Sequence, residues 1–227
     1  MDKHHLKREV TQTEDGSVTL FIPELDEHYH SVHGAVQESR HVFIEAGLRH
    51  SNLECLTILE AGFGTGLNAL LTYFEAKCTG RKVHFVTMEK YPLVSEEYCV
   101  LNYGHLVDEQ DGADVLMALH NAPWGEKVVM SDFFSITKLH VDMKHVKWDD
   151  IPPVDLVYYD AFAPDIQPSL WSDTLFESVV NTMSSNGILT TYCAKGVVRR
   201  SLQSAGLTME RLPGPPGKRE MLRGVKR

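Results

Sequence analysis

The sequence is poor in cysteine and in long apolar runs. Its four cysteines are scattered and form no CxxC pair, which indicates reduced thiols and excludes a disulfide framework or a cysteine-based zinc site. The twelve histidines show no HExxH or similar spacing, so we expect no metal site. No stretch approaches ~18 uninterrupted apolar residues, and the N-terminus MDKHHLKREV has no apolar signal core. These absences predict a soluble, cytoplasmic protein that does not enter a membrane.

Positive charge is scarce over most of the chain. The net charge is −9, but residues 195–227 hold nine Lys and Arg against two Glu, so the preceding part is strongly acidic. Such asymmetry favours an interaction surface, for which a solvated basic tail is the alternative.

Strand and helix patterns alternate along the chain, which predicts an α/β fold with a mostly parallel, doubly wound sheet. No Pro/Gly/Ser-rich linker interrupts the alternation, so we expect one domain over residues 1–227, with residues 1–50 as an N-terminal strand-and-helix extension and 51–227 as a Rossmann-like core. Strands are predicted at 17–25, 56–61, 81–89, 127–142 (two short strands), 154–160, 187–193, 207–212 and 219–225. Helices are predicted at 34–48, from 66 onward, and at 95–103, 112–121, 172–183 and 196–205.

Acidic residues end four of the predicted strands. Glu60, Glu89 and Asp160 each close an apolar strand, and Asp142 closes a mixed one. In an open α/β sheet, ligands bind outside the carboxyl ends of the strands, near the point where strand order reverses. Packing alone does not explain four such acids, because each must be solvated or paired. They therefore predict a binding site at this edge.

The glycine turn EAGFGTG follows the first of these strands. Gly62, Gly64 and Gly66 allow a tight turn and a close approach of ligand to main-chain N–H groups at a helix start. The E-x-G-x-G-x-G pattern favours S-adenosylmethionine, whereas NAD is the alternative that a glycine-rich loop alone leaves open. Glu89 would accept ribose hydroxyls of either cofactor. Asp142 would accept the adenine amino group, with Asp132 as the weaker candidate for that role.

Six sequence blocks stand out along the chain, namely ESRHVFIEAGL, EAGFGTGLNAL, MEKYPL, YDAFAPDIQPSLW, GVVRRSLQSAGL and GKREMLRG. Through these blocks the chain resembles a known family, the methyltransferase domain of the tRNA wobble-uridine enzyme MnmC and its stand-alone relatives. The resemblance runs from about Tyr29 to the C-terminus.

The resemblance implies a Rossmann-like class I methyltransferase that transfers methyl from S-adenosylmethionine to the aminomethyl group on carbon 5 of the tRNA wobble uridine. The cofactor would be lined by Glu60, Gly62, Phe63, Gly64, Gly66, Glu89 and Asp142. Asp160 would face the substrate amine, which it would orient first and deprotonate second. Phe162 or Trp171 would stack on the uracil, with core packing as the alternative for both. The residues expected to contact anticodon-stem phosphates are Lys195, Arg199, Arg200, Lys218, Arg219 and Arg223.

The chain departs from the bifunctional form of the family because few residues follow the KREML block. We therefore expect no flavin oxidoreductase module here and a substrate supplied by other enzymes. Ala161 and the Pro215-Pro216 pair are smaller departures. Three alternatives stay open, namely an NAD-dependent oxidoreductase, a methyltransferase of another amine substrate, and a non-catalytic tRNA-binding module.

Overall fold

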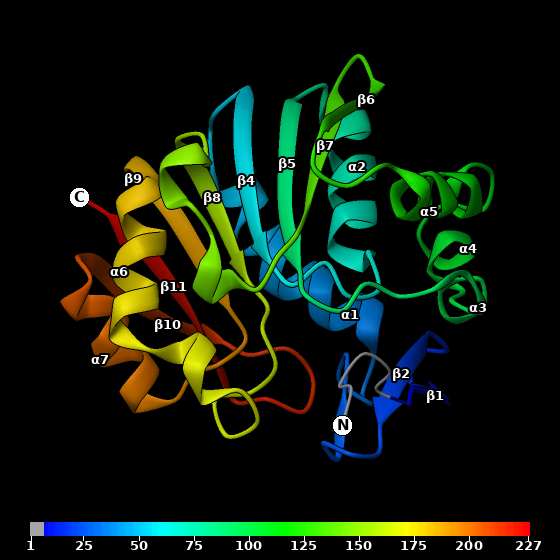
Figure 1. The fold of residues 1–227 in the computed structure, drawn as a ribbon, viewed down its shortest axis with the longest axis horizontal. Coiled ribbons are helices and arrows are strands. Elements are labelled where there is room, and N and C mark those ends of the chain that lie inside the picture. The colour runs from blue at the N-terminus through cyan, green and yellow to red at the C-terminus, as the bar shows by residue number, and fades with distance from the viewer. Residues whose placement is uncertain (1–6) are drawn as a thin grey trace.

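The computed structural model describes residues 7–227, which form one large sheet, one small sheet and flanking helices (Figure 1). The large sheet has eight strands in the order β10-β11-β9-β8-β4-β5-β7-β6. Its strands are β4 (Cys55–Ala61), β5 (Lys82–Glu89), β6 (Lys127–Ser131), β7 (Phe134–His140), β8 (Val154–Tyr159), β9 (Met183–Thr191), β10 (Leu207–Pro213) and β11 (Glu220–Lys226).

The large sheet is mostly parallel, which confirms the predicted fold class. β4 pairs in parallel with both β5 and β8, and parallel pairing continues outward to β7 on one side and β9 on the other. β6 and β11 run in the opposite direction to the other six strands of this sheet. The chain first builds outward from β4 through β5 and β7, then crosses to β8 on the other side. The strand order thus reverses beside β4, where ligands bind in such sheets.

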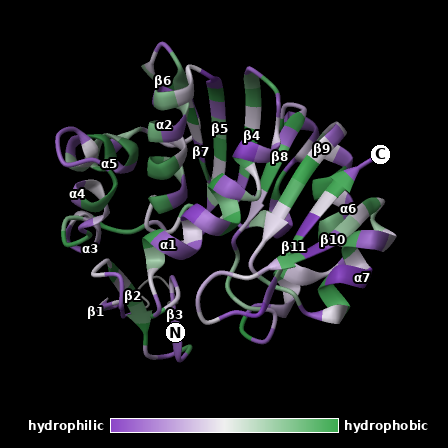
Figure 2. Cartoon of the chain, turned by 180° about the vertical axis from the view of Figure 1, so that it is seen from behind, coloured by the Kyte–Doolittle hydropathy of each residue, from purple (hydrophilic) through white to green (hydrophobic). Residues whose placement is uncertain are grey.

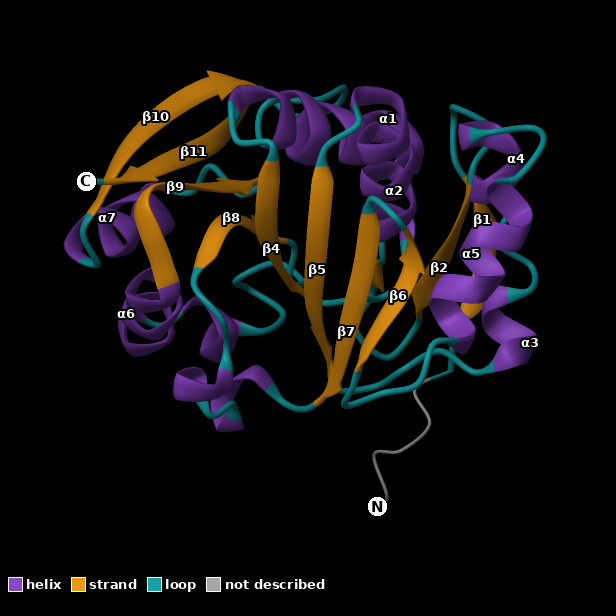
Figure 3. Cartoon of the chain, turned by 90° about the horizontal axis from the view of Figure 1, so that it is seen from above, coloured by secondary structure: helices purple, strands orange, loops and turns teal. Residues whose placement is uncertain are grey.

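Helices cover both faces of the sheet (Figure 3). One face carries α1 (Ala35–Ser39), which continues as a π-helical segment (Arg40–Glu45), together with α2 (Leu67–Thr79), α3 (Ser95–Tyr98), α4 (Tyr103–Val107) and α5 (Gly112–Asn121). The other face carries α6 (Asp173–Thr182) and α7 (Gly196–Ser204). Short 3-10 turns lie at Leu48–His50, Met143–His145, Trp148–Asp150 and Pro168–Trp171. Within residues 7–227, none of the helices is both long and apolar enough to cross a bilayer.

The two central strands, β4 and β8, are buried on both faces. Successive residues of a strand point to opposite sides of the sheet, so each of these strands contributes side chains to the hydrophobic clusters on both sides. Ile58 and Tyr158 pack in the cluster under α1 and α2, whereas Leu59 and Val157 pack in the cluster under α6 and α7. Figure 2 shows hydrophobic segments along the strands of the large sheet and hydrophilic ones on α7. This double burial produces the near-continuous apolar runs seen in the sequence.

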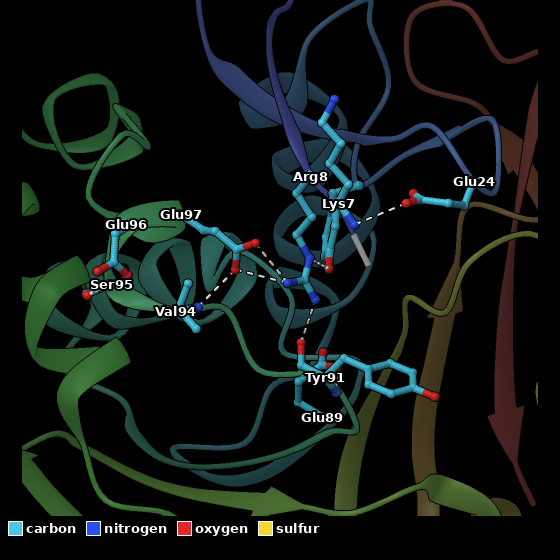
Figure 4. A network of polar contacts seen from close by, with 10 residues as sticks. Lys7, Arg8, Glu24, Glu89, Tyr91, Val94, Ser95, Glu96 and Glu97 are labelled. Atoms are coloured by element: carbon cyan, nitrogen blue, oxygen red, sulfur yellow. Dashed lines mark hydrogen bonds and ion pairs between the residues drawn. The ribbon is translucent and has the colours of Figure 1, made fainter. Parts of the chain in front are cut away.

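A small antiparallel sheet of β1 (Glu9–Gln12), β2 (Val18–Ile22) and β3 (Glu27–His28) precedes the core. Arg8 fastens it to the loop after β5 (Figure 4). Its guanidinium donates to both carboxylate oxygens of Glu97 at 3.0 and 2.9 Å, to the carbonyl of Tyr91 at 2.9 Å and to the hydroxyl of Tyr29 at 2.9 Å. The Arg8 side chain is only 5% exposed, so this pair is a buried one. The small sheet is therefore held against the carboxyl edge of the large sheet.

Several predicted element boundaries differ from the structure. The strand expected over 187–193 is β9, which begins at Met183, and the strand expected over 17–25 ends at Ile22. The helix expected over residues 95–103 ends at Tyr98, because the Asn102 amide accepts from the backbone N–H of Val18 at 2.8 Å and donates to the carbonyl of Gly16 at 2.9 Å. This contact with the small sheet outweighs local helix propensity. The strand expected to end at Asp142 ends earlier, at His140. Asp142 instead begins the next 3-10 turn, where its side chain accepts from the backbone N–H of Lys144.

Candidate active site

A cavity of about 540 Å³ opens at the carboxyl ends of β4, β5 and β8. The glycine turn forms its floor, residues 27–32 of the small sheet and the following loop form one wall, and residues 160–163 form another. Of the predicted site residues, those that line it are Gly62, Phe63, Gly64, Glu89, Asp142, Asp160, Phe162 and Lys218.

The glycine turn is held by the end of β5. The backbone N–H groups of Gly62 and Phe63 both donate to the carbonyl of Met88 at 3.1 Å. The N–H of Gly64 donates to Glu89 Oε2 at 3.0 Å, and the other Glu89 oxygen accepts from the N–H of Tyr91 at 2.7 Å. Glu89 therefore fixes the turn and still presents its carboxylate to the cavity.

Two glycines in this turn are required for different reasons. Gly64 has φ +49°, and a Cβ there would lie 3.2 Å from the Tyr29 ring that covers the turn. Gly66 has φ +74° at the start of α2, where a Cβ would lie 3.1 Å from His120 Nε2. Gly66 ends the turn at the start of α2 and does not itself line the cavity. A side chain at either position would crowd its neighbours, so the two glycines keep the turn compact beneath Tyr29.

Asp142 lines the cavity shortly after β7, between two lysines. Its Oδ2 is 2.9 Å from Lys90 Nζ and 3.6 Å from Lys144 Nζ. Burial acts to raise the pKa of Asp142, but the hydrogen bonds from Lys90 and from the Lys144 backbone outweigh it and lower the pKa. Asp142 is therefore a carboxylate at neutral pH. Asp132, the weaker candidate, lies in the β6–β7 turn and borders a separate hollow with Cys55 at the opposite edge of the sheet.

Asp160 follows β8 directly and faces the cavity. Its Oδ2 accepts a hydrogen bond from Asn68 Nδ2 of α2 at 2.8 Å. Burial raises the pKa of Asp160 to about 7, the nearby Glu38 carboxylate adds to the rise, and the Asn68 hydrogen bond and the Lys218 charge oppose it. A carboxyl group with such a pKa is able to exchange a proton near neutral pH.

The structure corrects the placement of Glu60. It is fully buried behind the glycine turn, where its Oε2 accepts from Thr87 Oγ1 at 2.7 Å, and it does not line the cavity. Burial raises its pKa well above the ordinary value. The reason is side-chain alternation in β4: Glu60 points to the same face as Ile58, which packs under α1 and α2.

The two predicted stacking aromatics have different surroundings. Phe162 lines the cavity and meets the Tyr29 ring edge-on, with 5.1 Å between ring centroids. Trp171 is 7% exposed and packs against Tyr159 and Phe176 under α6, while its indole N–H donates to the Phe162 carbonyl at 2.8 Å. Trp171 is thus a core residue that supports the loop carrying Phe162, as in the packing alternative.

The basic residues near the C-terminus do not form one surface. Lys218 lies in the cavity, where its ammonium pairs with Glu38 and lies 4.0 Å from the centre of the Tyr192 ring. Lys195 pairs with Asp165 on the surface. The four predicted arginines also lie in different surroundings. Arg199 donates to Gln203, and Arg223 pairs with Glu210. Arg200 and Arg219 are exposed.

Several cavity residues carry no local sequence signal. Tyr29, Glu38 and Tyr192 come from three separate segments, so only the tertiary fold brings them together. Asn68 did have a signal, because it is the one polar residue in the first turn of the otherwise apolar helix start LNALL. In the part of the chain that the structure describes, no cluster of three or more His, Cys, Asp or Glu residues is placed to hold a metal ion.

Comparison with known proteins gives a consistent result. A family model described as an S-adenosyl-L-methionine-dependent methyltransferase matches residues 128–227. The bifunctional tRNA 5-methylaminomethyl-2-thiouridine biosynthesis protein MnmC of Cupriavidus metallidurans is 32% identical over 220 residues, which is 89% of this chain and 32% of that protein. The MnmC protein of Idiomarina loihiensis is also 32% identical, over 88% of this chain and 35% of that protein. The chain spans about a third of the length of these curated relatives.

Among solved structures, MNMC2 from Aquifex aeolicus superposes with a TM-score of 0.81 at 22% identity, covering 100% of this chain and 72% of that one. This match shows the same fold. The prediction of S-adenosylmethionine as the cofactor is confirmed by the matched family model, which gives no support to the NAD-dependent alternative.

Proposed function

We propose that this chain, an S-adenosylmethionine-dependent methyltransferase similar in fold and sequence to the MnmC methyltransferase domain, methylates the aminomethyl group on carbon 5 of the wobble uridine in tRNA. Similarity to MnmC supports the choice of tRNA and of uridine. The observation that carries the amine chemistry is Asp160, a cavity-facing carboxyl group with a pKa of about 7 beside the cofactor floor.

The cavity fits the cofactor. Gly62 and Gly64 place no side chain in the turn at the floor, and Glu89 and Asp142 follow β5 and β7, on the other side of β4 from Asp160. We assign the glycine turn to the methionine part, Glu89 to the ribose hydroxyls and Asp142 to the adenine amino group. When bound, S-adenosylmethionine supplies an electrophilic methyl group, so the protein has mainly to position a neutral amine in line with it.

Asp160 supplies this positioning. A primary alkylamine is mostly protonated at neutral pH, if the lysine reference pKa of about 10.4 is a guide. An ionised Asp160 accepts a hydrogen bond from the amine and fixes the direction of its lone pair. It also takes a proton that the amine loses, because its pKa of about 7 is matched to neutral conditions. Asn68 holds the carboxylate in place through the hydrogen bond that its Nδ2 donates to Asp160 Oδ2.

Recognition of the tRNA needs a base contact and phosphate contacts. Phe162, at the cavity wall next to Asp160, is placed to stack on the uracil. The exposed Arg200 and Arg219 are the strongest remaining candidates for phosphate binding, since no acidic partner neutralises them in the described ion pairs. The proposal places the protein in the cytoplasm, where tRNA is available.

The test is methyl transfer from labelled S-adenosylmethionine to tRNA that carries 5-aminomethyl-uridine, with and without the 2-thio group, followed by nucleoside analysis. We expect label in 5-methylaminomethyl-uridine, and none in tRNA that lacks the aminomethyl group. Label in another nucleoside, or in a small amine but not in this tRNA, would contradict the assigned substrate while leaving the methyltransferase activity intact.

A further inference from the structure

The ring of Tyr29 touches two walls of the cavity. On one side it lies over the glycine turn, since a Cβ at Gly64 would be 3.2 Å from Tyr29 Cδ1 and 3.4 Å from Tyr29 Cε1. On another side it meets the ring of Phe162 at 5.1 Å between centroids, with an interplanar angle of 72°. Phe162 follows Asp160 by two residues, and both line the cavity with Tyr29. Tyr29 therefore lies where the floor of the cavity meets the loop that carries Asp160.

Arg8 holds this ring in place. Its Nε donates to the Tyr29 hydroxyl at 2.9 Å, and the rest of the guanidinium is bound to Glu97 and to the Tyr91 carbonyl (Figure 4). Both Glu97 carboxylate oxygens accept from Arg8, so the positive charge beside Tyr29 is already compensated and does not repel a second cation. The ring is thus fixed before a ligand binds, which lowers the entropic cost of a contact with it.

The position of Tyr29 coincides with the place we assign to the sulfur of S-adenosylmethionine. The proposed function gives the methionine part to the glycine turn and the ribose to Glu89, and the sulfur atom joins these two parts of the cofactor. Gly64 and Glu89 are themselves in contact, because the Gly64 N–H donates to Glu89 Oε2 at 3.0 Å. Tyr29 lies over Gly64 at this junction.

The chemistry of the sulfur suits an aromatic neighbour. The sulfonium of S-adenosylmethionine is a permanent cation, whereas the sulfur of the product S-adenosylhomocysteine is a neutral thioether. Aromatic rings attract a cation within about 6 Å of the ring centre. Burial raises the pKa of Tyr29 to about 12, so the side chain is a neutral phenol and any attraction comes from the ring and not from a phenolate charge.

We propose that the Tyr29 ring binds the sulfonium of S-adenosylmethionine through a cation–π contact, so that the site favours the methyl donor over S-adenosylhomocysteine. This inference rests on the cofactor placement in the proposed function. Methyl transfer leaves a neutral sulfur, so the product loses the contact and is bound less tightly than the donor. Arg8 is then the positioning residue that keeps the ring at the sulfur.

The test measures the dissociation constants of S-adenosylmethionine and S-adenosylhomocysteine by calorimetry, in the full chain without tRNA. The informative quantity is the ratio of the two constants, because loss of packing alone weakens both ligands alike. Tyr29→Leu removes the ring, and the preference for S-adenosylmethionine should fall by about 2- to 30-fold. Tyr29→Phe keeps the ring and loses only the hydroxyl that Arg8 binds, so its ratio should stay close to that of the wild type.

Tyr91→Leu is the matched control. Tyr91 is also a tyrosine that lines the cavity, but its ring lies 5.0 Å from the Lys90 ammonium. Its contacts with Glu89 and Arg8 are made by the backbone and remain in the variant. The ratio should therefore equal that of the wild type. Equal weakening of both ligands in Tyr29→Leu would overturn the proposal, and so would a fall of the ratio in Tyr29→Phe as large as in Tyr29→Leu.

A second measurement applies if Tyr29→Leu does not fold. Tyr29→Phe variants that carry one, two or three ring fluorines keep the shape of the ring and progressively weaken its attraction for cations. Affinity for S-adenosylmethionine should fall stepwise with the number of fluorines, while affinity for S-adenosylhomocysteine stays constant. An affinity for S-adenosylmethionine that does not depend on fluorination would refute the contact.

These affinities are measured without methyl transfer, so they separate this inference from the assigned substrate. If tRNA with 5-aminomethyl-uridine were not methylated, the substrate in the proposed function would be wrong, while the ratios above would still decide the role of Tyr29. If Tyr29→Leu weakened both ligands equally, Tyr29 would be removed from the sulfonium and the tRNA assignment would stand.

Discussion

Replacing Asp160 with asparagine should stabilise the protein while removing most of its activity. The asparagine keeps the size of the side chain and an oxygen that accepts from Asn68 Nδ2, which lies 2.8 Å from the native carboxylate. It removes the charge and the ability to take a proton. General-base contributions are typically about 10²–10⁴-fold, so single-turnover methyl transfer should fall within that range.

The gain in stability follows from the raised pKa. The ordinary value for aspartate is 3.8, and burial raises the pKa of Asp160 to about 7 in the folded protein. Between these values the folded state binds more protons than the unfolded state, so the free energy of unfolding falls as pH rises through this window. At about 1.4 kcal/mol per pKa unit, the full cost of ionised Asp160 above pH 7 is at most about 4 kcal/mol. Asp160→Asn does not ionise, so the variant does not lose this part of the free energy of unfolding.

Urea unfolding near pH 4 and again above pH 7 measures the effect. We expect the variant to gain stability over the wild type, by up to about 4 kcal/mol, only at the higher pH. Asp155→Asn serves as a matched control, because the Asp155 carboxylate also accepts a hydrogen bond, from the Thr57 backbone N–H at 2.9 Å, but lies at the other end of β8. An equal difference between variant and wild type at both pH values would refute the raised pKa of Asp160.

Three further predictions concern binding. Glu89→Ala should weaken S-adenosylmethionine binding in calorimetry by about 1–3 kcal/mol, because the N–H groups of Gly64 and Tyr91 lose their acceptor as well; unchanged affinity would remove Glu89 from the ribose site. Asp142→Ala should weaken the same binding and Asp132→Ala should not, and the opposite result would move the adenine contact to the other edge of the sheet. Alanine at both Arg200 and Arg219 should lower tRNA affinity and flatten its salt dependence without changing cofactor affinity, whereas equal salt slopes would return both residues to the solvated surface.

The fold was predictable because its signals are local. Alternating apolar strands and amphipathic helices give the parallel sheet, and the turn residues after β4 and β5 give its carboxyl edge. The break at Asn102 was not predictable, since its cause is a pair of hydrogen bonds to residues 16 and 18 of the small sheet. Distant contacts of this kind leave no trace in periodicity.

The site was predictable only where a residue sits next to a strand end or a turn. Glu89 and Asp160 meet this condition, and both line the cavity. Trp171 lies near Asp160 in sequence, yet its side chain packs under α6, because proximity along a loop does not fix side-chain direction. Glu38 and Tyr29 reach the cavity from the N-terminal segment, which no spacing rule connects to the strand ends.

The four strand-end acids show why residue type alone does not assign a role. Glu60 is buried without a charged partner, and burial favours its neutral form. Asp142 is held below its ordinary pKa by hydrogen bonds from Lys90 and the Lys144 backbone, against the effect of burial. Asp160 lies between these cases, with a pKa of about 7. One sheet edge thus holds a fixed negative charge at the end we assign to adenine and a carboxyl group able to exchange a proton at the end we assign to the amine. That separation is what in-line transfer to a neutral amine requires, because the acceptor must lose a proton while the binding site for the cofactor keeps its charge.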